Sequence, residues 1–166
     1  MAKYEEWITP EGLLDELKKP IMYQMSGNEK NLESNIIDNI DLVCECLKLP
    51  KIEIVDSQRM IDANGFYIKP DILVRHIDET MTVFEVKKAS EKHPATGPTN
   101  QMAAVGQLLL YKNVLEEKIN CNVRVALIDN KIYYRTFCAF INNRLPITLI
   151  DFQKDRLFVP YNGWRR

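Results

Sequence analysis

Apolar residues recur every three or four positions in two long segments, which is the spacing of one buried face of an α-helix. The first segment runs from about residue 28 to 49 and stops before Pro50, whose ring and missing N–H end a helix. The second runs from Asn100 to about Glu117. We therefore predict two long amphipathic helices. A short helix is also expected near residues 10–17, within an N-terminal extension of residues 1–28.

The remaining apolar positions form short runs bounded by turn residues, which is typical of β-strands. The expected strands cover residues 52–55, 66–76, 81–87, 123–128, 132–138, 147–152 and 157–159. The second and third of these form a predicted hairpin around residues 77–80, and the fourth and fifth a hairpin across residues 129–131. Residues 89–99 are polar and are expected to form a mobile loop. This order of helices and strands predicts an α/β fold, with a central mixed β-sheet flanked by helices.

Composition narrows the class of protein without naming a function. The chain has 166 residues and 46% hydrophobic residues, which fits one soluble domain over residues 1–166. No apolar run is long enough to cross a membrane, and the N-terminus lacks a signal-peptide core, so a cytoplasmic protein is expected. The four cysteines match no metal-binding spacing and are expected to be reduced. A net charge of −1 argues against a strong nonspecific duplex binder but does not exclude a nuclease.

Two acidic residues and a lysine stand among strand-forming residues of the first predicted hairpin. Asp71 follows Pro70 at the start of one strand, and Glu85 and Lys87 lie near the end of the other. A buried strand does not tolerate these charges without partners or a metal ion. Taken singly, a Pro-Asp pair is a common turn and a lysine at a strand end is often solvated. Together, the three residues fit a site that holds a divalent cation against a phosphodiester.

The register of this hairpin decides whether the three residues meet. A two-residue loop would set Asp71 opposite Val86, whereas a three-residue loop or a bulge sets it opposite Glu85 or Lys87. The proposed chemistry requires the second arrangement, so we predict an odd loop or a bulge. Asp71, Glu85 and Lys87 then share one face of the sheet. The other face is filled by Ile72, Val74, Phe84 and Val86.

Polar residues on the two predicted helices add to this candidate site. Glu33 lies on the apolar face of the first helix, where it either faces the same site or stabilises the first helical turn through the helix dipole. Gln107 and Tyr111 are four residues apart and share one face of the second helix. They either support the site or are the polar edge of an amphipathic helix.

The order of these pieces resembles the PD-(D/E)XK nuclease superfamily. The pieces are Glu33, Pro70-Asp71, Glu85-Val86-Lys87 and the pair Gln107 and Tyr111. The glutamine–tyrosine pair, a QxxxY motif, is similar to that of the RecB-like branch. Similar pieces occur in the nuclease domain of type I restriction motor subunits and in NucS-type endonucleases. The resemblance covers residues 28 to about 112, and nothing after about residue 118 contributes to it.

The resemblance implies a restriction-endonuclease-like fold and magnesium-dependent cleavage of phosphodiester bonds. We expect DNA as the favoured substrate, although the sequence itself does not decide between DNA and RNA. Asp71, Glu85 and the carbonyl of Val86 are the implied ligands of Mg²⁺, for which Mn²⁺ is a substitute. Glu33 would ligate directly or through water, and Lys87 would position or activate the attacking water. Gln107 and Tyr111 would support the site.

The sequence leaves three questions open. Lys88, Lys92 and His93 follow the catalytic strand and either contact phosphates or belong to a plain connector. The chain is either an active nuclease, a nuclease-fold module without catalysis that binds nucleic acid or assembles with partners, or an unrelated α/β binding domain. A small nuclease that cuts both strands would act as a homodimer, and the sequence leaves the oligomeric state undecided.

Overall fold

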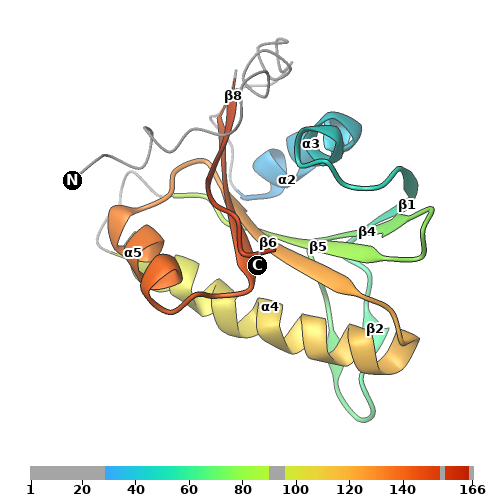
Figure 1. The fold of residues 1–166 in the computed structure, drawn as a ribbon. Coiled ribbons are helices and arrows are strands. Elements are labelled where there is room, and N and C mark those ends of the chain that lie inside the picture. The colour runs from blue at the N-terminus through green and yellow to red at the C-terminus, as the bar shows by residue number, and fades with distance from the viewer. Residues whose placement is uncertain (1–28, 90–95, 154–155, 165–166) are drawn as a thin grey trace.

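The computed structural model describes residues 29–89, 96–153 and 156–164 (Figure 1). The expected helix near residues 10–17, and the whole N-terminal extension, lie outside the described residues. The described elements are α2 (Glu29–Asp38), α3 (Ile40–Cys46), β1 (Ile52–Ser57), β2 (Ile61–Asp62), β3 (Tyr67–Ile68), β4 (Ile72–His76), β5 (Met81–Val86), α4 (Gly97–Ile119), β6 (Val123–Asp129), α5 (Tyr134–Asn142), β7 (Ile147–Gln153) and β8 (Arg156–Tyr161).

A six-stranded mixed sheet forms the centre of the fold, in the order β1-β4-β5-β6-β7-β8. The central strands β5, β6 and β7 are parallel, and the outer pairs are antiparallel. Helices α2 and α3 cover one face, and α4 and α5 cover the other (Figure 1). The predicted α/β fold with a mixed sheet flanked by helices is confirmed. A separate two-stranded ribbon pairs β2 with β3.

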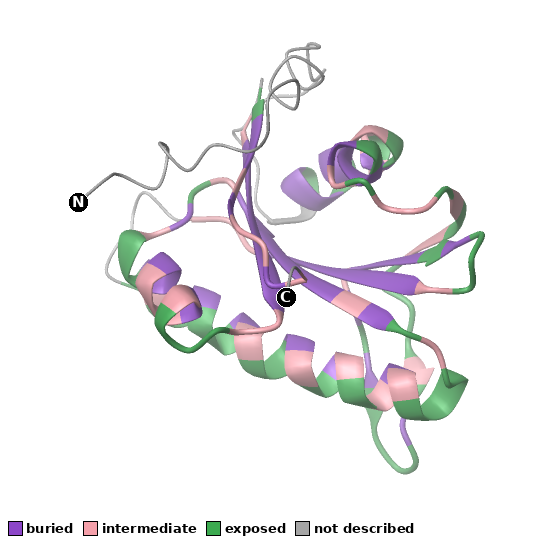
Figure 2. Cartoon of the chain, viewed as in Figure 1, coloured by how far each residue is buried: buried purple, intermediate pink, exposed green. Residues whose placement is uncertain are grey.

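The two faces of the sheet carry separate hydrophobic cores, because alternate residues of a strand point to opposite faces. Helices α2 and α3 bury Leu32, Ile36 and Val43 against one face. Helix α4 buries Leu108 and Leu115 against the other. Strands β5 and β7 are buried along almost their whole length, as Figure 2 shows in purple. No helix in the described part of the chain is both long and apolar enough to cross a membrane.

Two predicted elements are divided in the structure. The first long helix is interrupted at Asn39, which leaves the helical conformation between α2 and α3. The predicted strand over residues 66–76 is split at Pro70 into β3 and β4, since proline has no N–H for a strand ladder. The turn before β3 contains Asn64 and Gly65, both with positive φ, at 58° and 109°. The α4 helix begins at Gly97, so it includes the end of the predicted loop.

The predicted strand over residues 132–138 is wrong. Residues 134–142 form the helix α5, which buries Thr136, Phe137 and Phe140. Strands β6 and β7 are parallel neighbours, so the chain between them must cross from one end of the sheet to the other. A tight hairpin joins only antiparallel strands and cannot make this connection. Aromatic residues favour strands locally, but their spacing of three here also suits the helix that this crossover requires.

Candidate functional site

The β4–β5 hairpin has the odd loop that the sequence predicted. Its connection consists of residues 77–79, closed by hydrogen bonds from His76 N–H to the Thr80 carbonyl (2.9 Å) and from Glu79 N–H to the His76 carbonyl (3.0 Å). Glu79 has φ 70°, which is the left-handed residue that ends a common three-residue hairpin loop. Strand pairing runs from Arg75 with Met81 to Ile72 with Phe84. One further step of this register sets Asp71 opposite Glu85.

The faces of the hairpin are also as predicted. Ile72, Val74, Phe84 and Val86 belong to the core beneath α2 and α3. Leu73 and Val83 belong to the core beneath α4. Alternation along β5 therefore directs Glu85 and Lys87 to the α4 side. Glu85 is buried, at 3% exposure, and Lys87 is half-buried.

Asp71 stands at the entrance of β4 and reaches across to the neighbouring strand. Its Oδ2 accepts a hydrogen bond of 2.8 Å from the backbone N–H of Val86. This contact takes the place of a ladder hydrogen bond and holds the carboxylate beside the peptide that follows Glu85. Asp71 itself is half-buried, so the site is reachable from solvent.

Tyr111 of α4 faces both acidic residues. Its ring is buried, and its hydroxyl makes a long contact of 3.5 Å with the Lys69 carbonyl. Burial raises the pKa of Tyr111 to about 12, and the negative charges of Glu85 and Asp71 add to that rise. The structure thus brings Tyr111 to the candidate site.

Glu33 reaches the same region from α2 and is held there by two residues at the end of β1. Ser57 Oγ donates to Glu33 Oε1 (2.9 Å), and Gln58 Nε2 donates to Oε1 (3.1 Å) and Oε2 (2.9 Å). The same Gln58 nitrogen lies 2.8 Å from Asp71 Oδ1. One amide group therefore joins the carboxylates of Glu33 and Asp71. Glu33 faces the site, although nothing in the helix pattern alone required it.

Gln58 is the residue that the sequence reasoning missed. It follows the last residue of β1, carries no hydrophobic signal, and has φ 55°, a conformation that costs energy for a residue other than glycine. Its backbone N–H donates to the Asp71 carbonyl (3.0 Å), so both its backbone and its side chain bind Asp71. The only local signal was a polar Ser57-Gln58 pair at a strand end.

Among the predicted site residues that the structure describes, Gln107 does not join this cluster. Gln107 is exposed on α4, and its side chain makes no hydrogen bond within the described part of the chain. The buried face of that helix instead presents Gln101, Ala104, Leu108, Tyr111 and Leu115. Lys88 is half-buried at the end of the described segment after β5, and Lys92 and His93 lie outside the described residues.

A second buried carboxylate lies beside Lys87. The β5–β6 register pairs Val86 with Ile128, and the Lys87 N–H donates to the Ile128 carbonyl (2.9 Å), so Asp129 is the neighbour of Lys87 on the next strand. Asp129 accepts hydrogen bonds from Ala89 N–H (2.9 Å) and Gln101 Nε2 (2.8 Å). Burial raises its pKa to about 7. The sequence had marked this position only as a turn.

The oxygen donors at the site suit a hard cation such as Mg²⁺. The resemblance implies two carboxylates, from Asp71 and Glu85, and one carbonyl, with water completing the six ligands that Mg²⁺ takes. Among the described residues, no group of three or more His, Cys, Asp or Glu side chains is close enough to hold a metal ion. The Gln58 amide, however, sits between two carboxylates as a cation would. These oxygen donors therefore fit Mg²⁺. Glu33 is linked to Asp71 by the Gln58 amide, so it would act on the ion through an intermediate group.

Comparison with known proteins gives no match: no family model fits the chain, and no curated protein or solved structure is significantly similar to it. The functional assignment therefore depends on the chain's own residues and their arrangement.

Proposed function

We propose that this protein is a divalent-metal-dependent nuclease that hydrolyses phosphodiester bonds in nucleic acid, with DNA as the favoured substrate. The observation that carries the proposal is the register of the β4–β5 hairpin, which pairs Ile72 with Phe84. Continued by one residue, this register sets Asp71 across from Glu85, with Lys87 two residues further on. Tyr111 faces both acids from α4. Acids and a lysine brought together at the ends of adjacent strands are costly to bury unless they serve a ligand.

Each residue has a distinct task in this proposal. Asp71, Glu85 and the Val86 carbonyl would hold Mg²⁺, which supplies a polarised water and offsets charge on the phosphate oxygens. The Lys87 ammonium orients the attacking water and donates to the oxygen on which negative charge develops. Glu33 acts through a neighbouring group, since Gln58 lies between it and Asp71. The Tyr111 hydroxyl keeps its proton, because its pKa is raised to about 12, and it therefore acts as a hydrogen-bond donor.

The experiment combines metal binding with cleavage. Calorimetric titration with Mg²⁺ and Mn²⁺ is followed by incubation with single-stranded, duplex and branched DNA and with RNA. We expect metal binding, cleavage of at least one DNA substrate, and loss of cleavage in EDTA. The absence of cleavage of every substrate by protein that binds metal would refute the nuclease proposal.

A second candidate is a nuclease-fold module that binds nucleic acid or assembles with partners without catalysis. The observation in its favour is Gln58, whose amide N–H groups already satisfy the Glu33 and Asp71 carboxylates without a cation. This candidate predicts binding of nucleic acid that does not depend on Mg²⁺ or Mn²⁺ and is not followed by cleavage.

A further inference from the structure

A narrow two-stranded ribbon, residues 59–69, leaves the main sheet at the candidate site. Ile61 pairs with Ile68 and Asp62 pairs with Tyr67. The hydrogen bond from Gln58 N–H to the Asp71 carbonyl (3.0 Å) continues this pairing to the base of the ribbon. The two residues that bracket the ribbon are thus the two that share a hydrogen bond in the candidate site. From there the ribbon extends past α4 (Figure 1).

The inner face of the ribbon is packed and fixed. Ile68 is buried at 2% exposure, and Ile61 packs against the same core as α4. Lys118 Nζ of α4 donates to the Asp62 carbonyl (2.7 Å). The ribbon is therefore held against α4 by both apolar contact and a hydrogen bond. Its other face, called the outer face here, points away from this core.

The outer face of the ribbon carries two large, exposed side chains, Met60 and Tyr67. Tyr67 lies on it, opposite Asp62, and one step further the register sets Met60 opposite Lys69. Tyr67 is 66% exposed and Met60 is 60% exposed, and Phe66 at the turn is 46% exposed. Figure 2 shows most of the ribbon as exposed. A strand with one buried face normally carries polar residues on the other, so two large apolar side chains there indicate a surface that meets a ligand.

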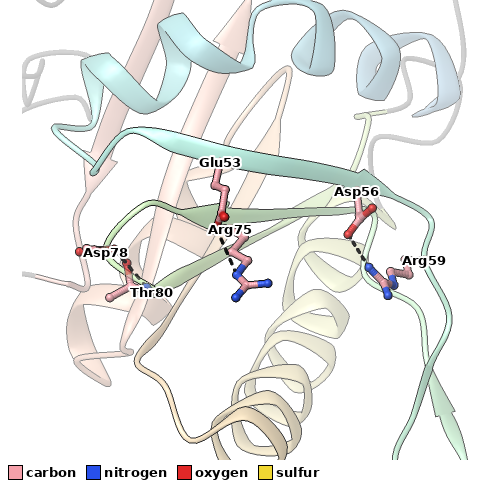
Figure 3. Close-up of polar contacts among 6 residues, drawn as sticks. All are labelled: Glu53, Asp56, Arg59, Arg75, Asp78 and Thr80. Atoms are coloured by element: carbon pink, nitrogen blue, oxygen red, sulfur yellow. Dashed lines mark hydrogen bonds and ion pairs between the residues drawn. The ribbon is translucent and has the colours of Figure 1, made fainter.

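Two basic side chains lie near Tyr67, alongside the exposed Asp62 opposite it. Lys69 is exposed, two residues from Tyr67 on the same face. Arg59 stands at the base of the ribbon with its side chain 63% exposed, where it pairs with Asp56 at 2.9 Å (Figure 3). An aromatic ring next to a cation is the combination that binds single-stranded nucleic acid, where the ring stacks on an unpaired base and the cation meets the phosphate.

We propose that the outer face of the 59–69 ribbon binds single-stranded nucleic acid, with Tyr67 stacked on an unpaired base and Lys69 against the backbone. The inference rests on the proposed function for the identity of the substrate and adds its form: an unpaired strand that leads to the site at the base of the ribbon. A duplex keeps its bases inside the stack and offers no free base face to Tyr67.

The test measures binding without cleavage. Fluorescence anisotropy in EDTA compares a labelled single strand of about 12 nucleotides with the matching duplex. We expect tighter binding of the single strand, and about tenfold weaker binding by Tyr67→Ala, which corresponds to one stacked base. Tyr67→Phe keeps the ring and should bind like the wild type. Tyr134→Ala removes another exposed tyrosine, on α5, and should also bind like the wild type.

A direct signal comes from Tyr67→Trp, whose fluorescence should be quenched when a base stacks on the indole. The proposal is overturned if Tyr67→Ala binds the single strand as tightly as the wild type. It is also overturned if Tyr67→Ala leaves binding unchanged but turns a dimer into a monomer in analytical ultracentrifugation, because the face would then bind a second copy of the chain. Circular dichroism and melting temperature check that each variant is folded.

The results separate this inference from the proposed function. If the wild type cleaves DNA but Tyr67→Ala binds and cleaves single strands equally well, the ribbon proposal fails and the nuclease proposal stands. If binding depends on Tyr67 but no substrate is cleaved with Mg²⁺ or Mn²⁺, the ribbon proposal stands and the nuclease proposal fails.

Discussion

The side-chain amide nitrogen of Gln58 lies 2.8 Å from Asp71 Oδ1, and the same nitrogen donates to both carboxylate oxygens of Glu33. Donation to carboxylates defines which way the amide faces, since its carbonyl oxygen would be repelled there. A residue at the end of β1 thereby links the helix α2 to the start of the β4–β5 hairpin. Because both acids already have this partner, a cation that binds them must compete with Gln58 or bind beside it.

Replacement of Gln58 tests that competition. Gln58→Ala removes the amide donors, so the apparent affinity for Mn²⁺ should rise several-fold, while stability without metal falls by about 1 kcal/mol. Calorimetry measures the affinity, and melting temperature with and without Mn²⁺ measures the stability. Equal stabilisation of wild type and Gln58→Ala by Mn²⁺ would show that the amide does not compete with the metal.

Loss of either hairpin acid should abolish cleavage. Asp71→Ala and Glu85→Gln would each remove a proposed metal ligand, and a contribution of several kcal/mol corresponds to at least about a thousandfold in rate. Glu53→Gln is the matched control, because Glu53 lies on β1 in an exposed ion pair with Arg75 (3.4 Å, Figure 3). A steady-state cleavage assay should find that control unchanged. Activity retained by purified, folded Asp71→Ala would disprove the site.

Lys87 should be needed for cleavage but not for metal binding. Its ammonium makes no hydrogen bond or ion pair within the described part of the chain, so Lys87→Ala breaks no structural contact there. We expect loss of cleavage with an unchanged Mn²⁺ titration. Lys51→Ala, a change of an exposed lysine just before β1, serves as the control. A Lys87→Ala protein that no longer binds Mn²⁺ would assign the lysine a structural role.

Asp129 predicts a pH dependence of stability. Its folded pKa is raised by burial from 3.8 to about 7, so between these values the folded protein holds a proton that the unfolded chain has released. Its contribution to stability is thus complete below about pH 4 and falls by about 4 kcal/mol as the pH rises to 7. Urea unfolding of wild type and Asp129→Asn from pH 4.5 to 8 measures this. The difference in stability between them should change across that window; a constant difference would contradict the raised pKa.

The two glutamines of α4 should differ in their effect on stability. Gln101 is 1% exposed, donates to Asp129 Oδ2 (2.8 Å), and accepts from Tyr133 N–H (3.3 Å). Gln101→Ala leaves these partners unsatisfied and should cost about 1–3 kcal/mol. Gln107 is exposed, so Gln107→Ala should change stability by less than about 0.5 kcal/mol. Chemical denaturation separates the two, and equal losses would mean that Gln107 has contacts beyond those described.

The hairpin that carries Asp71 and Glu85 was predictable from sequence because its determinants are local. Apolar alternation in β4 and β5 assigns their faces, whereas the odd loop was predicted because the proposed chemistry requires Asp71 opposite Glu85 or Lys87. The first helical segment ends at Cys46, before the expected stop at Pro50, and Lys48 has a left-handed φ of 56° just after that end. Strand alternation involves residues that are near one another along the chain, so a single sequence contains the information for it.

What the tertiary structure alone decided involves distant segments. The helix α5 forms because β6 and β7 are parallel neighbours, which no local pattern reveals. Gln58 lies between Glu33 and Asp71 because α2 and the ends of β1 and β4 meet there. Asp129 lies beside Lys87 because β5 and β6 are neighbouring strands. The burial of Tyr111 and the exposure of Gln107 follow from which face of α4 packs against the sheet. The strand faces thus follow from alternation along the chain, whereas these contacts depend on how whole elements pack against one another.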